Sequence, residues 1–401
     1  MPRKAFFTTE DAKAAFNLFC CVYGIGTLGM PANFSRAGPF IAVIAMVFMA
    51  FANVYGAVAI CRVMLLAPTS VKTYGDLGEW AMGKTGRYLS VISQMANCLL
   101  VPCVFLVLGG TLLDGLFPGA FSATTWIILM ALSCMPVCLV PTLKEGAGAA
   151  FAGCMGTIIT DVIGVAVVMH GMRGHPSIPK PDLNFKQVAG AFGNLALAYG
   201  AGIVIPALQR QHSDPTRMPR VVGVTMTFIS VLFLILASTA YSSIGCQISG
   251  NLLYAIYPDS DTGLTTLGFR SDWEAAEYRG ANAIKYVILR LIMITLLVIA
   301  SIILKDHFHD LADFAGASCI TVNSIILPIV FLLKKKWNVM PLWEKAPALI
   351  VVVVCFSLGC YVTYTSGKNL FAPSDDDTAF PFCASEFENN VYYNYTAEHE
   401  T

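Results

Sequence analysis

A series of long apolar stretches constrains this chain more than any other feature. A helix needs about 17–25 mostly apolar residues to cross a bilayer, and we predict ten such stretches. They lie at about 14–34, 40–61, 88–113, 124–140, 151–170, 190–208, 221–244, 283–304, 314–333 and 347–366. The sequence therefore predicts an all-α integral membrane protein with about ten transmembrane helices.

Composition supports the same class and sets the domain organisation. The 401 residues are 56% hydrophobic and 12% charged, which is about half the charged fraction of soluble domains. We expect one transmembrane domain at 1–366 and a polar, acidic, disordered tail at 367–401. The net charge of zero gives no sign of nucleic-acid binding. Without a nucleophile–base constellation, phosphate loop or metal signature in the sequence, we expect no enzyme, no metal and no cofactor, with the lipid bilayer as a partner.

Lysine and arginine are distributed unevenly between the loops. The loops on the N-terminal side carry more of them than the loops on the other side, up to the eighth stretch. Because cytoplasmic loops are enriched in these residues, we predict a cytoplasmic N-terminus. Most of the 13 cysteines lie inside apolar stretches, where they act as small packing residues. Cys246 and Cys383 lie outside the stretches and are the one pair that we consider for a disulfide.

The first stretch contains the sequence GIGTLGMP, which should interrupt a helix. Gly24, Gly26 and Gly29 are followed by Pro31. Such residues are tolerated in a transmembrane helix when protein, water or a ligand satisfies the freed backbone groups. One interpretation is a substrate site, in which exposed N–H groups and the positive end of a half-helix hold a carboxylate. The other is that small residues let a neighbouring helix approach closely.

A second interruption lies in the sixth stretch. Tyr199, Gly200, Ala201 and Gly202 form a flexible centre, and Pro206 follows. Paired interruptions at corresponding positions of two halves point to the binding site of a secondary transporter. These two are five stretches apart, and the pair favours transport over simple packing.

Asp161 is the most informative residue outside the interruptions, because it lies near the centre of the stretch GTIITDVIGVAVVMH. A carboxyl group at that depth costs a few kcal/mol on insertion scales, so it needs a partner or a task. It could be a proton-coupling site, since burial disfavours the charged form. It could instead be a hydrogen-bonded acid that holds two helices together. A third alternative is that the span is shifted and the acid lies nearer water.

Four motifs give the chain a resemblance to the amino acid/auxin permease family. They are GIGTLGMPANFSRAG, TYGDLGEWAMGKTGR, LAYGAGIVIPALQRQHSDP and LADFAGASCITVNSIILPIVFLLK. The resemblance extends from Ala12 to Lys334 and implies a leucine-transporter-like fold, with two inverted five-helix repeats, broken helices 1 and 6, and an eleventh helix. It also implies amino acid transport coupled to protons or sodium.

The resemblance implies roles for particular residues. The unwound backbone at Gly24, Ile25, Gly26, Thr27 and Leu28 would bind the substrate carboxylate. Tyr199, Gly200 and Ala201 would face the substrate's amino group and side chain. Two positions depart from the family pattern: Gly202 stands where a histidine is frequent, and Ala207 stands where a glutamate is frequent.

The family's eighth helix is missing from the hydropathy pattern. The seventh stretch ends near Cys246, and the run from Arg290 to Leu304 resembles the ninth family helix, with no stretch long enough to cross a bilayer between Cys246 and Ala281. Ten alternating spans would also place Lys334, Lys335, Lys336 and Lys345 opposite the N-terminus, against the charge bias. We predict that the eighth helix is absent, through an incomplete gene model or a real deletion. The alternative is that the insert folds back as a partial helix.

Taken together, these features predict a secondary active transporter of small neutral amino acids, a symporter driven by protons or, failing that, sodium. A plasma membrane and a vacuolar or lysosomal membrane both fit, and the sequence sets no oligomeric state. The alternatives are a receptor-like protein that binds an amino acid without net transport, and an ion channel.

Overall fold

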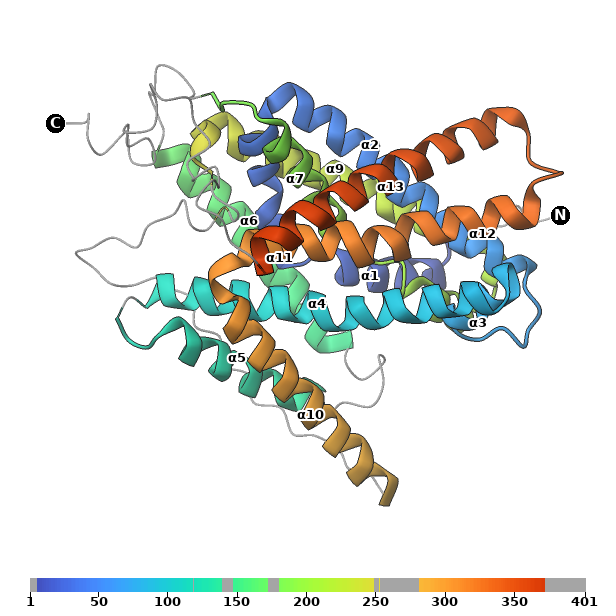
Figure 1. Ribbon diagram of the computed structural model, residues 1–401, viewed down its shortest axis with the longest axis horizontal. Coiled ribbons are helices and arrows are strands. Elements are labelled where there is room, and N and C mark those ends of the chain that lie inside the picture. The colour runs from blue at the N-terminus through green and yellow to red at the C-terminus, as the bar shows by residue number, and fades with distance from the viewer. Residues whose placement is uncertain are drawn as a thin grey trace.

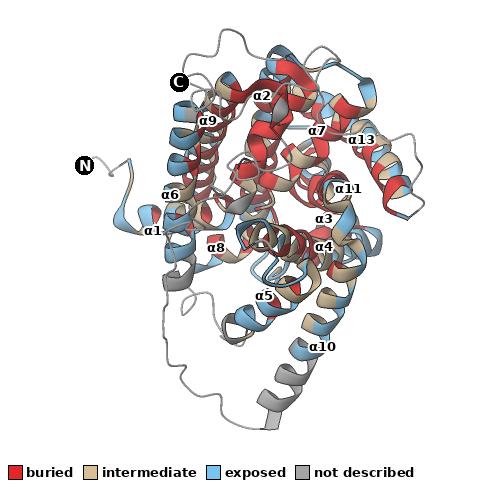
Figure 2. Cartoon of the chain, turned by 90° about the vertical axis from the view of Figure 1, so that its left-hand side faces the viewer, coloured by how far each residue is buried: buried red, intermediate tan, exposed pale blue. Residues whose placement is uncertain are grey.

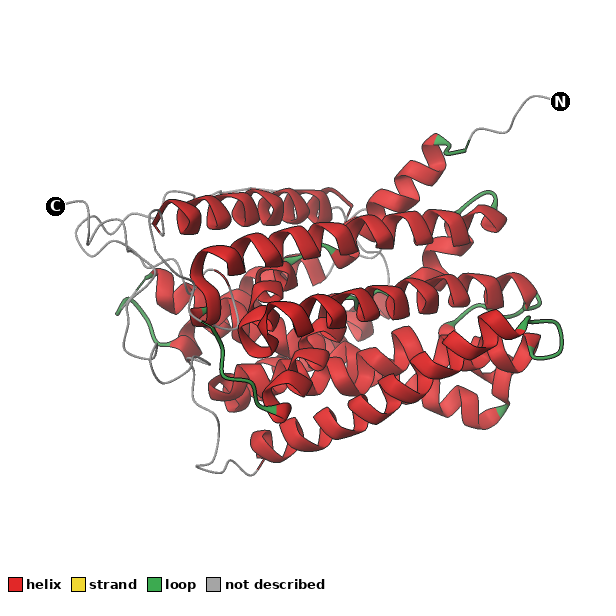
Figure 3. Ribbon diagram, turned by 90° about the horizontal axis from the view of Figure 1, so that it is seen from above, coloured by secondary structure: helices red, strands yellow, loops and turns green. Residues whose placement is uncertain are grey.

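The computed structural model describes residues 6–117, 119–138, 147–171, 180–248, 252 and 281–371. The elements in these ranges are helices joined by turns, which confirms the all-α prediction (Figure 1). In chain order the α-helices are α1 (Thr9–Val22), α2 (Met30–Leu66), α3 (Tyr74–Met82), α4 (Lys84–Leu116), α5 (Ala123–Cys138), α6 (Ala147–Gly171), α7 (Phe185–Ala198), α8 (Ile205–Gln211), α9 (Met218–Ile244), α10 (Ala281–Leu304), α11 (Phe308–Ala315), α12 (Leu327–Lys336) and α13 (Leu342–Phe371). Most of them run along one common direction (Figure 3).

Within the described ranges, six helical segments are long and apolar enough to cross a membrane. They are Gly26–Leu66, Lys84–Leu116, Phe151–His170, Pro215–Ile244, Leu291–Lys336 and Leu342–Phe371. Two of the six, with 41 and 46 residues, are about twice as long as one crossing needs. The described part of the chain is therefore an integral membrane protein, while the number of ten crossings stays a prediction.

A sharp bend divides the first of these long segments. Gly38 has φ +69° and ψ 161° inside α2, and Pro39 follows it. This left-handed conformation strains any residue with a side chain, and proline has no N–H to continue the ladder. The bend falls between the first two predicted stretches, 14–34 and 40–61, so α2 contains the end of one and the whole of the next.

Apolar side chains cover the outside of the bundle as well as its core. The core holds buried Leu18, Phe34, Phe233 and Phe331, and buried residues lie at the centre of Figure 2. Exposed apolar side chains follow the outer faces of α2, α9 and α13, at Phe40, Ile44, Val47, Phe228, Val231, Ile235, Ile350, Val353 and Phe356. A surface of this kind fits a hydrocarbon solvent.

The positive loops gather at one end of the bundle, which we call the basic end. Gln209 in α8 donates to the Cys61 carbonyl near the end of α2, at 3.2 Å. The turn between α12 and α13 lies there too, because Lys335 sits over the Trp80 ring at 3.9 Å and Arg62 pairs with Glu344 at 2.7 Å. The four lysines of this turn are thus on the N-terminal side, opposite to the placement that ten alternating spans would give.

The direction of the helices after α9 accounts for this difference. α9 starts at the basic end and finishes at the opposite end, which we call the far end (Figure 1). α10 also runs toward the far end, since Lys305 just after it donates to Thr124 at the start of α5, at 3.2 Å. α9 and α10 therefore run in the same direction, whereas consecutive alternating spans would run in opposite directions. Residues 249–251 and 253–280, where the eighth family helix is predicted to be absent, lie outside the described residues.

The last helix finishes at the far end. α13 starts beside Arg62 and continues beyond the expected domain boundary at 366 to Phe371. It continues because its final turn is packed, with Asn369 donating to Asp310 of α11 at 3.2 Å. Residues 372–401, most of the predicted tail, lie outside the described residues.

Candidate substrate and proton site

The first glycine-rich stretch leaves α-helical geometry as its sequence predicts. α1 ends at Val22, Tyr23 and Gly24 have extended backbones, and a single tight turn at Ile25–Gly29 leads into α2. Pro31 lies in the first turn of α2, where its missing N–H breaks no hydrogen bond.

Open space beside two of these glycines separates the two interpretations of the stretch. A Cβ added at Gly24 or Gly26 would meet no described atom within 4 Å. Close packing against a described helix therefore does not account for glycine at these two positions. By contrast, a Cβ at Gly56 of α2 would collide with the backbone of Ser324, which is what a packing glycine looks like.

The second interruption separates α7 from α8. α7 ends at Ala198. The chain then makes a tight turn, in which the Ala201 N–H donates to the Tyr199 carbonyl at 2.6 Å. Helical geometry resumes at Ile205. The Gly202 N–H, freed by the interruption, donates to the Ser324 hydroxyl at 3.3 Å.

A residue other than glycine has no room at Gly202. A Cβ there would lie 2.8 Å from the Cα and Oγ atoms of Ser324 and 2.9 Å from the Asn323 carbonyl oxygen. Ser324 belongs to a π-helical segment, Val322–Ile326, and such segments are frequent at functional sites. The departure from histidine thus has a steric cause in this chain.

The two interruptions are neighbours in space. α7 contacts the Ile25–Gly29 turn, and Asn194 of α7 donates to the Gly29 carbonyl at 3.1 Å and to the Asn33 side chain at 3.2 Å. The negative C-terminal end of α7 and the positive N-terminal end of α2 are thereby held in one region. These are the polarities that an amino acid's ammonium and carboxylate groups require.

The side chain of Tyr199 is already engaged. Its hydroxyl donates to Ser230 of α9 at 3.0 Å, and its ring meets Phe233 edge-on at 5.3 Å. The Tyr199 side chain is therefore held by α9 in this conformation.

Asp161 of α6 reaches the first interruption. The Tyr23 hydroxyl donates to Oδ2 at 2.8 Å, and the Thr27 hydroxyl lies 3.0 Å from both carboxylate oxygens. The residue is 3% exposed, which does not favour the alternative that it lies nearer water. The other two interpretations, a proton site and an acid that links helices, both fit this geometry.

Protonation of Asp161 would change the contacts of the interruption. A carboxylate only accepts hydrogen bonds, whereas a protonated carboxyl must donate one. Tyr23 and Thr27 flank Gly24 and Gly26, so a proton on Asp161 would redirect hydroxyls that hold this backbone. Sequence reasoning missed Tyr23, although a hydroxyl next to a glycine break was a usable signal.

A buried ion pair that the sequence did not reveal lies at the far end. Arg36 of α2 contacts Asp313 of α11 through Nη1–Oδ1 at 3.1 Å and Nη2–Oδ2 at 2.5 Å. Gly190 makes room for it, because a Cβ there would run into the guanidinium. Asp313 follows a polar linker in the sequence, which hid its burial.

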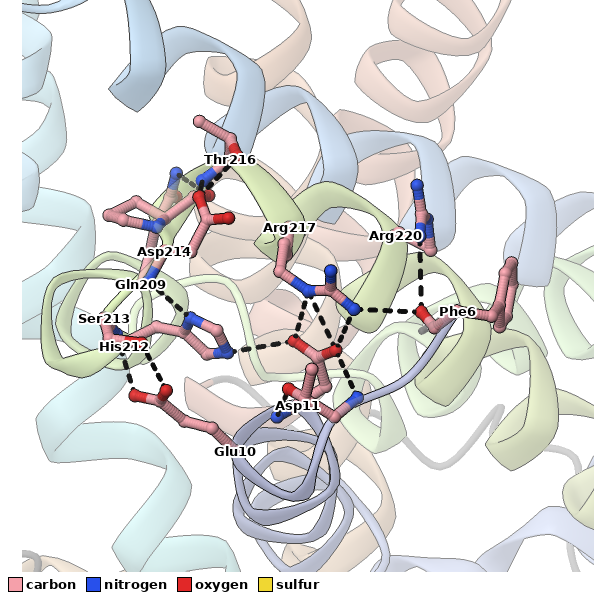
Figure 4. Close-up of polar contacts among 12 residues, drawn as sticks. Phe6, Glu10, Asp11, Gln209, His212, Ser213, Asp214, Thr216, Arg217 and Arg220 are labelled. Atoms are coloured by element: carbon pink, nitrogen blue, oxygen red, sulfur yellow. Dashed lines mark hydrogen bonds and ion pairs between the residues drawn. The ribbon is translucent and has the colours of Figure 1, made fainter. Parts of the chain in front are cut away.

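A second network ties α1 to the α8–α9 linker at the basic end (Figure 4). Arg217 binds Asp11 through Nε at 2.9 Å and Nη2 at 2.6 Å, and His212 Nε2 lies 3.1 Å from the same carboxylate. Glu10 accepts hydrogen bonds from the N–H and the hydroxyl of Ser213. Asp11 also forms a capping box with Thr8, a pattern visible in the sequence.

Hydrogen bonds keep the two carboxylates of this network ionised. The guanidinium of Arg217 holds the pKa of Asp11 far below its usual range. The Ser213 hydroxyl and N–H lower the pKa of Glu10. Both carboxylates are therefore ionised at neutral and mildly acidic pH.

Cys246, at the end of α9, is disulfide-bonded and fully buried. Its expected partner, Cys383, lies outside the described residues.

These features define a class: a helical membrane protein in which two breaks between helices lie close together and a buried acid contacts the first of them. The chain matches the family model described as transmembrane amino acid transporter protein over residues 8–267, more than half of its length. It belongs to that family, and the resemblance seen in its motifs is confirmed. Since the family's members are transporters, the chain is not an enzyme.

Several characterised relatives have similar sequences. Amino acid transporter AVT1I of Arabidopsis thaliana is 24% identical, over 89% of this chain and 94% of the relative. Amino acid transporter AVT3A of the same plant is 22% identical, over 89% and 88%. Vacuolar amino acid transporter 7 of Saccharomyces cerevisiae is 24% identical, over 63% and 53%.

Proposed function

We propose that this protein is a secondary active transporter that moves small neutral amino acids together with protons. Family membership supports amino acid transport. The contact of Asp161 with Tyr23 and Thr27 is the observation that carries proton coupling. The name of the yeast relative favours a vacuolar or lysosomal membrane over the plasma membrane.

In this proposal the substrate binds between the two interruptions. Its carboxylate accepts hydrogen bonds from the backbone of Gly24–Leu28, where the open side of Gly24 and Gly26 allows approach. Its ammonium group faces the C-terminal end of α7, at Tyr199–Ala201. A small neutral side chain suits a region whose facing residues are glycine and alanine.

The proton step follows from the same geometry. Ionised Asp161 accepts from both hydroxyls and holds the first interruption in the form seen here. Protonation removes the charge and redirects one hydrogen bond, so that the interruption and the proton site change together. Sodium in place of the proton is the alternative that the experiment must separate.

The test is uptake of radiolabelled alanine into proteoliposomes, with a pH gradient, a sodium gradient or neither. We expect accumulation driven by the pH gradient. Asp161→Asn mimics the protonated acid, so exchange of substrate across the membrane should persist while accumulation falls to the level without a gradient. The matched control is Asp182→Asn, an exposed acid, which should behave as the unchanged chain.

Other results would identify the alternatives. Normal pH-driven accumulation in Asp161→Asn would exclude this residue from coupling. Saturable binding without accumulation would indicate a receptor-like protein. Current that does not depend on substrate would indicate a channel.

A further inference from the structure

We propose that the turn between α12 and α13 binds the headgroups of anionic phospholipids in the leaflet at the basic end. The turn connects Lys336 to Leu342 and is compact, since the Lys336 carbonyl accepts from the N–H groups of Val339 and Met340 at 3.0 and 2.9 Å. This inference does not depend on the proposed function.

Positive charge at this turn exceeds what the neighbouring acids neutralise. Glu344 is occupied by Arg62 at 2.7 Å, and Glu79 on the adjacent α3 is occupied by Arg87. In the described part of the chain, neither Lys334 nor Lys336 pairs with a carboxylate. The turn therefore presents cations without counter-ions.

Two tryptophans fix the other lysines of the turn. Lys335 Nζ lies 3.9 Å from the centre of the Trp80 ring, and Lys345 Nζ lies 4.9 Å from that of Trp337. Cations over indole faces keep their charge, and tryptophan is enriched at the level of lipid headgroups. The amino groups are thereby held at the depth where phosphates lie.

Apolar side chains at the turn point outward. Val339 is 84% exposed, Leu342 80% and Trp343 76%. Such residues at the end of a membrane helix are expected to enter the lipid, not water. A turn that inserts these side chains next to unpaired lysines has the two properties that a phospholipid requires, an apolar part and a cationic part.

Charge at a helix C-terminus has a simpler explanation, which the experiment must exclude. Lysines in the last turn of α12 complement the helix dipole, and loops on the cytoplasmic side are generally basic. Either effect alone predicts no preference for this turn over other lysines at the same end, such as Lys72 and Lys84.

The test measures binding of short-chain lipids to the purified full-length protein in neutral detergent by thermophoresis. Dioctanoyl-phosphatidylserine should bind more tightly than dioctanoyl-phosphatidylcholine, and the difference should fall at high salt. Each lysine near a phosphate is worth about a factor of five, so the double variant Lys334→Gln and Lys336→Gln should weaken phosphatidylserine binding about 25-fold. The matched double variant Lys72→Gln and Lys84→Gln should change it less than about threefold.

Two further measurements test which part of the lipid is bound, and a single variant serves as a control for instability of the double variant. Trp343→Ala should weaken binding of the lipid, and glycerophosphoserine, which lacks acyl chains, should compete poorly. Lys336→Gln alone should show an intermediate effect if the double variant is unstable. Equal binding of the two lipids, equal effects of the two double variants, or full competition by glycerophosphoserine would each overturn the proposal.

Discussion

At the scale of single residues, glycine serves two different purposes in the two interruptions. Gly24 and Gly26 face open space, whereas Gly202 is fitted against the π-helical segment around Ser324. The same residue type therefore lies beside open space in one case and makes a close backbone contact in the other. Sequence alone cannot separate these cases, because the difference lies in residues more than a hundred positions away.

This difference makes Gly26→Val an informative variant. Because no described atom lies within 4 Å of a Cβ at this position, the variant should fold and insert normally. Its branched side chain should block the approach of a carboxylate to the N–H groups, so substrate binding should be lost. Binding by scintillation proximity, with Gly26→Ala as a graded control, checks this. Wild-type affinity in Gly26→Val would leave the motif without a role in binding.

Prediction of individual residues from the sequence succeeded where the residue type was rare in its surroundings. Asp161 was identified because a carboxyl in an apolar stretch is exceptional. Tyr23 was missed because tyrosine is ordinary there, and the pair formed by Arg36 and Asp313 was missed because the two residues are 277 positions apart. Pairing across long sequence separations depends on the fold, and a single sequence does not display it.

At the scale of elements, α1 is a short half-helix whose outer end is tied down. Asp11 holds it to Arg217, and the extended backbone at Tyr23 and Gly24 frees its other end from α2. The N-terminal end of α1 can move away from the α8–α9 linker only if the hydrogen bonds of the network in Figure 4 break. Its capping box could be read from the sequence, but the partner on the α8–α9 linker could not.

The charge of Asp11 should set the stability of this attachment. The pKa of Asp11 is lowered in the folded protein, so the attachment is fully present above the ordinary aspartate pKa of about 4. It is lost only as the pH falls further, through the lowered value. Hydrogen exchange of the α1 amides should therefore be as slow, relative to intrinsic rates, at pH 5 as at pH 7.5.

Asp11→Asn should accelerate that exchange at both pH values, because it removes the charge that Arg217 binds. Glu10→Gln is the matched control, with a smaller effect expected since Glu10 is at the surface. Loosening of α1 in the unchanged protein between pH 7.5 and 5 would show that another group governs the attachment.

At the scale of the whole molecule, the sequence predicted an integral membrane protein and most of its helices, but not all of the points at which helices break or bend. The length of each apolar stretch identified a span, because a helix needs about 17–25 apolar residues to cross the hydrocarbon core. It did not reveal α3, which is short and amphipathic, or the bend at Gly38. Ten alternating spans would place the lysines of the α12–α13 turn opposite the N-terminus, against the charge bias, and the structure places this turn at the basic end, beside Arg62 and Trp80.

The direction of α13 leads to a prediction about topology. α13 finishes at the far end, so with a cytoplasmic N-terminus the tail should be on the opposite side and Asn394 in its Asn-Tyr-Thr sequon should be glycosylated. A glycosidase-sensitive mass shift, abolished by Asn394→Gln, checks this. A tail that stays unmodified and is accessible from the cytoplasm would fit ten alternating spans instead.

Sequencing the transcript across codons 245–285 tests whether the eighth family helix is absent from the gene model or from the protein. A chain that truly lacks it should have a gap beside the substrate site and impaired transport. The uptake assay is therefore best run on the chain encoded by the verified transcript, so that failure of transport and failure of the coupling proposal remain distinct.

The disulfide at Cys246 has a consequence for the orientation in which each molecule is inserted into the membrane. Cytosolic thiols are kept reduced, so the far end must have entered an oxidising compartment when the bond formed. Redox chemistry and the lysine bias thus favour the same orientation, with the basic end in the cytoplasm, for unrelated physical reasons. A copy inserted upside down would carry a free thiol in place of the bond. Alkylation of the denatured chain, read by mass spectrometry at the peptide that contains Cys246, could therefore count correctly oriented molecules in a membrane preparation.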